Sequence, residues 1–273
     1  MEHNELEILT KKANEIRIKT IDAIGYFGQG HIGGSLSIVE VLTVLCYRHM
    51  RFRPSDREER DRDYLIISKG HAGPTLYSIL ADKGFFDESW LHTLNKGGTK
   101  LPSHCDRVKT PGVDMSTGAL GQGLSVGVGM ALGNRLDKID RTVYVIVGDG
   151  ECNEGQVWEA AMSAAHFKLT RLIAFTDYNK MQIDGYVNQV MNIEDVTSKW
   201  LSFGWYVQRI DGHNLSEIDR AILNAKHEKE RPSMIVLDTV KGKGAFFAEG
   251  KVNSHYMTFD YQKAKEAIER LGH

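Results

Sequence analysis

Apolar positions repeat at helical spacing in the first part of the chain. From Leu6 to Ile24 they alternate with Lys, Glu and Arg, which predicts an amphipathic helix. A glycine-rich break follows, GYFGQGHIGGSLS, from Gly25 to Ser37. The next apolar run, IVEVLTVLCYRHM, predicts a second helix that Ser35 or Ser37 could cap. Further helices are predicted over TLYSILADKG, near residues 88–94, and over LSVGVGMALGNRL.

Continuous apolar runs in the second half are typical of strands that are buried on both faces. Two of them, VYVIVGDG from Val143 to Gly150 and LIAFTD from Leu172 to Asp177, enclose the helical pattern GQVWEAAMSAAHFK. DYLIIS precedes them as a short strand, and WYVQRI, a helix over 215–227 and SMIVLDTV follow. This alternation predicts an α/β fold, a doubly wound parallel sheet flanked by helices. Since no repeat or linker interrupts it, we expect residues 1–273 to form a single domain.

Composition restricts the class of protein further. The 273 residues are 41% apolar and 26% charged, with a formal net charge of −2, so neither nucleic acid nor a membrane is indicated as a partner. The charged segment over 51–63 mixes both signs, and we interpret it as a solvated loop. Three cysteines form no CxxC pair, the N-terminal helix is too polar for a signal peptide, and no apolar run could span a membrane. We therefore expect a cytoplasmic protein with reduced thiols.

Polar side chains follow two of the predicted strands. Asp149 stands between two glycines directly after VYVIV, and Asn179 follows LIAFTD, with 28 residues between Gly150 and Asn179. Ligands of parallel α/β sheets bind beyond the carboxyl ends of the strands, and carboxylate and amide oxygens suit Mg²⁺ or Ca²⁺, with diphosphate oxygens completing the shell. An aspartate in such a turn more often caps the next helix, so the motif alone leaves both interpretations open.

Two further segments carry weaker signals for an anion site. GALGQG, from Gly118 to Gly123, opens a helix whose N-terminus would favour phosphate, although a plain glycine-rich turn is an equally good interpretation. It follows no convincing strand, which disfavours a nicotinamide-binding fingerprint. Glu154 begins the next helix, where the helix dipole alone accounts for an acidic residue.

Four histidines lie in loops flanked by glycine or serine: His31, His71, His104 and His255. A lone loop histidine is usually just exposed. Four of them beside predicted element ends suggest a site, because imidazole can donate to phosphate and can transfer protons near neutral pH.

These segments together resemble the signature blocks of transketolases. GDGECNEGQVWEAAMSAAHFKLTRLIAFTDYNKMQIDG is similar to the thiamine diphosphate signature of that family, and the other blocks follow in the family's order. They are GQGHIGGSLS, ISKGHAGPTLYSIL, LPSHCDRVKTPGVDMSTGALGQGLSVGVGMA, GWYVQRIDGHN and TVKGKGAFF. The resemblance covers about residues 8–258 and implies the thiamine-diphosphate-binding fold, in its diphosphate-binding (PP-type) form.

The resemblance also implies roles for particular residues. Asp149, Asn179 and the backbone carbonyl of Met181 would bind Mg²⁺, for which Ca²⁺ or Mn²⁺ could substitute. The remaining residues would contact the cofactor or line the substrate channel. Those expected at the cofactor are His71, Gly118, Ala119, Leu120, Gly150 and His255; those expected at the reacting sugar are His31, His104 and His255; and Glu154 would join an acidic contact across a subunit interface.

Two departures from the family pattern stand out. Ala119 replaces a frequent proline, which matters little where backbone atoms carry the role. HIGGSLS replaces the HPGAPMG-like form of full-length transketolases and resembles the split-subunit branch. The family's pyrimidine-binding domain, which supplies the glutamate that activates the cofactor, has no counterpart here. The resemblance thus implies a partner, the C-terminal transketolase subunit with the pyrimidine-binding and C-terminal domains, in an α₂β₂ assembly.

The function implied is transfer of a two-carbon ketol unit from a phosphorylated or otherwise anionic ketose to an aldose acceptor. A phosphorylated, sulfonated or branched donor is equally compatible with the sequence. Two alternatives stay open: a deoxyxylulose-phosphate-synthase-like subunit, which would decarboxylate pyruvate, and a non-catalytic cofactor-binding chain. GDGECNEG and the short loop between Asn179 and Trp200 favour transketolase over the first alternative.

Overall fold

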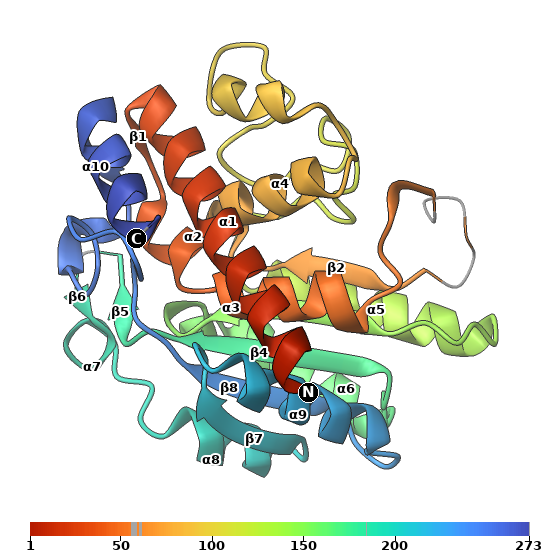
Figure 1. Ribbon diagram of the computed structural model, residues 1–273. Helices are drawn as coiled ribbons and strands as arrows, with labels where there is room; N and C mark the ends of the chain where they lie inside the picture. The colour runs from red at the N-terminus through yellow and green to blue at the C-terminus, as the bar shows by residue number, and fades with distance from the viewer. Residues whose placement is uncertain (56–58, 60–61, 184, 273) are drawn as a thin grey trace.

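Five parallel strands form the central sheet of the computed structural model, which describes residues 1–55, 59, 62–183 and 185–272 (Figure 1). Their order across the sheet is β2-β3-β4-β8-β7. The strands are β2 (Tyr64–Ile67), β3 (Val143–Gly148), β4 (Leu172–Tyr178), β7 (Tyr206–Asp211) and β8 (Ser233–Asp238). The predicted parallel α/β sheet is confirmed. Part of the charged 51–63 segment lies outside the described residues.

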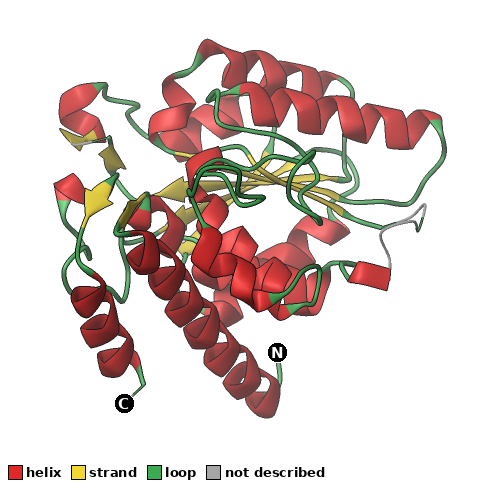
Figure 2. Ribbon diagram, turned by 90° about the horizontal axis from the view of Figure 1, so that it is seen from above, coloured by secondary structure: helices red, strands yellow, loops and turns green. Residues whose placement is uncertain are grey.

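Helices cover both faces of this sheet, and Figure 2 shows the strands between the two helical layers. Because side chains alternate along a strand, Val145 and Val147 of β3 join one apolar cluster, whereas Tyr144 and Ile146 join the other. The first cluster is covered by α5 (Gln122–Leu136), α6 (Gly155–His166) and α8 (Val196–Ser202). The second is covered by α1 (His3–Phe27), α3 (Val39–Val44), α4 (Gly73–Asp82), α9 (Leu215–His227) and α10 (Tyr261–Leu271).

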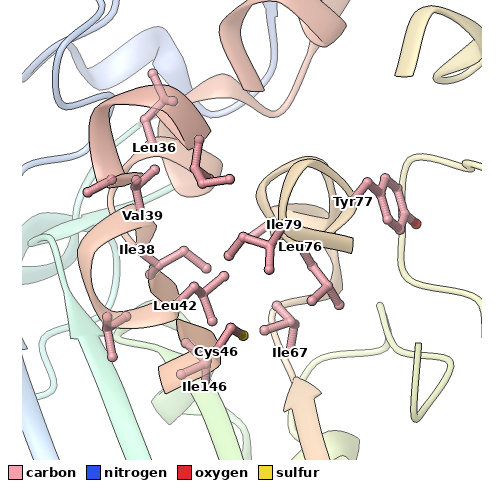
Figure 3. Packing of buried hydrophobic residues seen from close by; sticks show 14 of the residues in the cluster. Leu36, Ile38, Val39, Leu42, Cys46, Ile67, Leu76, Tyr77, Ile79 and Ile146 are labelled. Carbon is pink, nitrogen blue, oxygen red and sulfur yellow. The ribbon is translucent and has the colours of Figure 1, made fainter. Parts of the chain in front are cut away.

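The second cluster is the larger of the two, and Figure 3 shows its centre between α3, α4 and the strands. Leu42 and Cys46 there face Ile67 of β2 and Ile146 of β3. All three cysteines are buried and free, as the predicted reduced thiols require. Within the described ranges, none of the helices has the length and apolar character to cross a membrane.

The glycine-rich break differs from its prediction. It contains a short buried helix, α2 (Ile32–Leu36), and the helix expected over 38–50 divides into α3 and a π-helical turn, η1 (Leu45–His49). Neither serine caps α3, because Ser35 donates to the His31 carbonyl and Ser37 to Gly34 O and to the Asp177 carboxylate. The predicted helix near 88–94 is a 3₁₀ helix, η4 (Glu88–Thr93).

Several short elements lie beyond what the apolar pattern predicts. The expected loop between Asn179 and Trp200 contains the hairpin β5 (Met181–Gln182) and β6 (Gly185–Tyr186), then α7 (Val187–Val190) and most of α8. Three 3₁₀ turns, η3 (Gly70–Ala72), η5 (Gly150–Asn153) and η6 (Val252–Ser254), border the strand ends. An antiparallel pair, β1 (Gln29–Gly30) with β9 (Met257–Thr258), joins the two ends of the chain.

The N-terminal turn of α5 packs so closely on β2 that only glycine fits. A Cβ at Gly123 would lie 2.7 Å from the Ser68 Cα. Gly129 on the same helix is exposed, and a Cβ there would meet nothing within 4 Å.

We therefore predict opposite effects for two alanine substitutions in α5. Gly123→Ala should destabilise the chain by about 1–3 kcal/mol through overpacking. Gly129→Ala should stabilise it by up to about 1 kcal/mol through helix propensity. Urea unfolding of the two variants measures the difference, and equal midpoints would contradict the close packing at Gly123.

Candidate active site

The carboxyl ends of four strands meet at one edge of the sheet because the strands pair in parallel register. Gly148 of β3 lies opposite Asp177 of β4, and Tyr178 lies opposite Asp238 of β8. The residues that follow these strands surround a cavity of about 170 Å³. It is lined by Gly34, Lys69, His71, Leu120, Gly148, Asp149, Gly150, Glu151, Glu154, Asn179, Met181, Gln182, Ile183, Lys241 and His255.

Asp149 is held in the cavity wall by backbone groups of two strand-end loops. Its Oδ1 accepts from the Gly150 N–H at 2.8 Å, and its Oδ2 accepts from the Lys180 N–H at 2.5 Å. Burial, and then the charge of Asp177, raise the pKa of Asp149 to about 7. An ionised Asp149 is therefore costly without a cation beside it.

Asp177 lies beneath Asn179 and is completely buried. Its Oδ2 accepts from Lys69 Nζ at 2.5 Å, from Ser37 Oγ at 2.8 Å and from Asn179 Nδ2 at 2.9 Å, and Thr239 donates to its Oδ1. Burial alone would raise the pKa of Asp177, but the Lys69 ammonium and these hydrogen bonds hold it below its usual range. This network fixes the amide of Asn179 with its oxygen directed away from Asp177, toward the Met181 N–H at 3.1 Å.

Glu151 occupies the N-terminus of α5. One carboxylate oxygen accepts from the Gly121 N–H at 2.8 Å, the other from the Gly148 N–H at 2.9 Å, and Ser68 donates as well. The anion at this helix terminus is therefore a side chain of the chain itself. Leu120 reaches the cavity from the preceding turn, while Gly118 lies against His104, whose Cδ2 would be 3.0 Å from a Cβ at Gly118.

The four loop histidines form one cluster. The ring centroid of His31 lies 5.4 Å from that of His71, 5.3 Å from that of His104 and 5.3 Å from that of His255, and His71 and His255 are 4.9 Å apart. Burial, then the neighbouring His255, lowers the pKa of His31 to about 3. Burial likewise lowers the pKa of His71 and His104. Neutral rings of this kind can both donate and accept hydrogen bonds at neutral pH.

Eight of the twelve residues that the sequence analysis predicted at a site line this cavity: His71, Leu120, Asp149, Gly150, Glu154, Asn179, Met181 and His255. His31 and His104 join through the histidine cluster, and Gly118 lies beside His104. Ala119 is exposed and outside the lining. The roles of all twelve stay predictions.

Two buried lysines of the cavity were missed. Lys69 follows β2 and Lys241 follows β8, and only 1% and 2% of their surfaces are exposed. Both satisfy the strand-end rule that singled out Asp149, so the same signal was available for them. Glu151 and Gln182 were also missed.

The donor set at the cavity suits a hard cation. Among the described residues there is no group of three or more His, Cys, Asp or Glu that could hold a metal ion. The oxygens available instead are the Asp149 carboxylate, the Asn179 amide and the Met181 carbonyl, and one carboxylate with neutral oxygens is what Mg²⁺ uses when phosphates complete its shell. A Cβ at Gly150 would lie 2.8 Å from Gln182 Cγ, so glycine at this position lets the Gln182 side chain pack directly on the backbone after Asp149.

Known protein families and proteins of known sequence are similar to this chain over nearly its whole length. Residues 8–273 match the family model described as "Transketolase, thiamine diphosphate binding domain". The chain is 53% identical over 263 residues to the 6-deoxy-6-sulfo-D-fructose transketolase subunit of Clostridium sp. (strain MSTE9), covering 96% of each chain. It is 36% identical to an apulose-4-phosphate transketolase subunit of Phocaeicola vulgatus, covering 98% of this chain and 95% of that one.

A solved transketolase from Campylobacter jejuni superposes with a TM-score of 0.90 at 34% identity, over 97% of this chain and 43% of that one. A Pichia stipitis transketolase variant gives the same TM-score at 32% identity, and the chain spans 41% of its length. The chain therefore belongs to the transketolase family, a family of transferases. Within it, the chain corresponds to the N-terminal subunit of a split transketolase, because it matches two curated transketolase subunits over nearly their whole length and less than half of each solved chain.

Proposed function

We propose that the chain binds thiamine diphosphate and Mg²⁺ in the strand-end cavity and transfers a two-carbon ketol unit between sugars together with a second chain. The observation that carries the proposal is the cavity itself, where Asp149, Asn179 and Met181 lie beside two buried lysines and meet a cluster of four histidines.

Different residues of the chain would bind the metal and the diphosphate of the cofactor. Asp149, Asn179 and the Met181 carbonyl would bind the metal. Lys69 donates hydrogen bonds to Gly34 O, Ser37 Oγ and Asp177, so its charge is offset by the Asp177 carboxylate and it stabilises the wall instead of facing the ligand as a free cation. Lys241 brings a positive charge to the wall, which suits the negative charge of a diphosphate.

When bound, thiamine diphosphate supplies the electron sink for breaking and forming a carbon–carbon bond next to a carbonyl. The histidine cluster lies at the wall of the same cavity, through His71 and His255. As neutral rings, His31, His71 and His104 would orient sugar hydroxyls, donating a hydrogen bond from one nitrogen and accepting one at the other. His31 and His104 extend this surface away from the cavity toward solvent.

A second chain completes the site in this proposal. Relatives that match this chain over nearly their whole length are named as one subunit of a transketolase, which favours a partner that carries a pyrimidine-binding domain. Exposed apolar side chains at the cavity rim, Leu120 and Ile183, suit a surface that a partner covers. We propose an α₂β₂ assembly in which Glu154, exposed at the rim, joins a contact between subunits.

The relative with 53% identity suggests 6-deoxy-6-sulfo-D-fructose as the donor. The experiment is to mix the chain with its co-encoded partner, Mg²⁺ and thiamine diphosphate, and to follow ketol transfer to an aldose. We expect transfer from a ketose that carries an anionic group at C6, with the sulfonate preferred over fructose 6-phosphate, and no CO₂ from pyruvate.

Each component has its own control. Omitting either chain or adding a chelator should remove the activity. CO₂ release from pyruvate would instead support the deoxyxylulose-phosphate-synthase-like alternative. Cofactor binding without transfer from any ketose would favour a non-catalytic chain.

A further inference from the structure

A wide groove opens beside the histidine cluster and contains a second group of cations. Its volume is about 830 Å³. The segment over 95–111, yellow in Figure 1, forms one side, and residues next to β1 and β9 form the other. Three lysines, Lys96, Lys100 and Lys109, line it, and among the described residues its lining contains no aspartate or glutamate. We call this surface the lysine groove.

The inner end of the lysine groove touches the histidine cluster. Ser103 and Tyr256 belong to the groove's lining. The Ser103 Oγ lies 3.2 Å from His31 Nδ1, and the Tyr256 ring centroid lies 4.8 Å from that of His31. A molecule in the groove can therefore extend from the lysines to the histidines.

Two of the lysines are held in place by aromatic rings, and no acidic residue in the described part of the chain pairs with them. Lys96 Nζ lies 4.6 Å from the ring centroid of Tyr26, and Lys100 Nζ lies 4.7 Å from that of Trp90. An aromatic face attracts an ammonium group and leaves its positive charge uncompensated. Lys109 lies 3.9 Å from Asp106, an exposed pair that contributes little. All three side chains are exposed to solvent.

Hydrogen bonds hold the conformation of the loop that carries Lys96 and Lys100. The Asn95 N–H donates to Leu101 O at 3.1 Å, the Thr93 and Thr99 hydroxyls lie 2.8 Å apart, and the Thr110 hydroxyl donates to Lys100 O at 2.5 Å. Fixed cations lose less entropy on binding an anion than mobile ones. The groove is thus a formed surface with a formal charge of +3.

We propose that the lysine groove is a subsite of this chain for the anionic end of the sugar, a phosphate or a sulfonate, whose reacting end lies at the histidine cluster. The inference rests on the proposed function and adds a recognition element on the diphosphate-binding chain. Cations along such a groove raise the local concentration of an anionic substrate and its association rate, and salt weakens the effect.

Lysine labelling tests the subsite without activity. The chain is treated with a limiting amount of acetic anhydride, with fructose 6-phosphate, with 6-deoxy-6-sulfofructose or with fructose, and each lysine is followed by mass spectrometry. We expect both anionic sugars, and not fructose, to protect Lys96, Lys100 and Lys109, while the exposed Lys11, Lys229 and Lys263 stay equally labelled. Protection by one anion only assigns the subsite to that group. Protection that is absent, or equal with fructose, overturns the proposal.

Kinetics test its role in the two-chain enzyme. The variant Lys96→Gln/Lys100→Gln/Lys109→Gln is compared with Lys11→Gln/Lys229→Gln/Lys263→Gln, which removes the same charge elsewhere. We expect the ratio of kcat/KM for the anionic donor to that for neutral erythrulose to fall about tenfold in the first variant only. The wild-type salt dependence should flatten in parallel.

An unchanged ratio would overturn the subsite. A wild-type enzyme that transfers nothing from either donor would refute the proposed function instead, and the labelling result would still decide whether the groove binds anions.

Discussion

Replacing Asp149 by asparagine will abolish the Mg²⁺-dependent binding of thiamine diphosphate. Asparagine keeps the shape and one acceptor oxygen for the backbone N–H groups of Gly150 and Lys180, but it removes the carboxylate that we propose as the charged ligand of the metal. Loss of an outer-shell partner of a metal typically costs about 10–100-fold in affinity, so loss of the carboxylate itself should cost at least about 100-fold. Isothermal titration of the chain with thiamine diphosphate, with and without Mg²⁺, measures the change.

Asp238→Asn is the matched control for this variant. Asp238 ends a neighbouring strand at the same edge of the sheet, but its carboxylate pairs with Arg209 at 2.7 Å, outside the cavity lining. Its removal should leave cofactor affinity unchanged. Equal affinity of the Asp149→Asn variant and the wild-type chain would remove Asp149 from the metal site and with it the basis of the proposed function.

Replacing Asp177 by asparagine will destabilise the chain by about 3–5 kcal/mol, because the ammonium of Lys69 then stays buried without its counter-charge. Both partners are almost fully buried, and the pair is held by hydrogen bonds from Ser37 and Thr239. The midpoint of urea unfolding of the cofactor-free chain measures the loss.

A double variant separates the effect of the unpaired Lys69 charge from other causes of lost stability. Asp177→Asn with Lys69→Met leaves no buried charge, so it should regain part of the stability that the single variant loses. The exposed pair of Glu266 with Arg270 provides the reference, since Glu266→Gln should cost less than about 1 kcal/mol. If the single variant unfolds at the wild-type midpoint, the buried pair does not stabilise the fold and the prediction is wrong.

The sequence predicted the sheet well because buried parallel strands have a distinct pattern. VYVIVG and LIAFTD are apolar without interruption, since both faces of β3 and β4 are covered by helices. The strand-end rule then predicted Asp149 and Asn179 together, and the four histidines were recognised from their glycine and serine neighbours. That 1–273 form a single domain stays a prediction.

Other elements were missed for different physical reasons. α10 had a readable pattern that could have predicted it, with Tyr261, Ala264 and Ile268 at helical spacing and Asp260 as its cap. β1 and β9 have two residues each, too few for any period. Lys69 is a fully buried cation, against the strong tendency of lysine to stay exposed; its place after a strand could be read from the sequence, but its pairing with Asp177 is a tertiary contact that no local pattern indicates.

The pairing of β1 with β9 has a consequence for the order of folding. Gln29 lies opposite Thr258, so the strands that bring His31 beside His255 are joined across nearly the whole sequence. Contacts between distant positions form late, because closing a long loop costs entropy before the contact returns any stability. During synthesis, the cavity wall around Asp149 can form before the residues of β9 have left the ribosome. The histidine cluster cannot be complete until the β9 segment has emerged, so a chain interrupted shortly before it would keep the sheet and lack the complete histidine cluster.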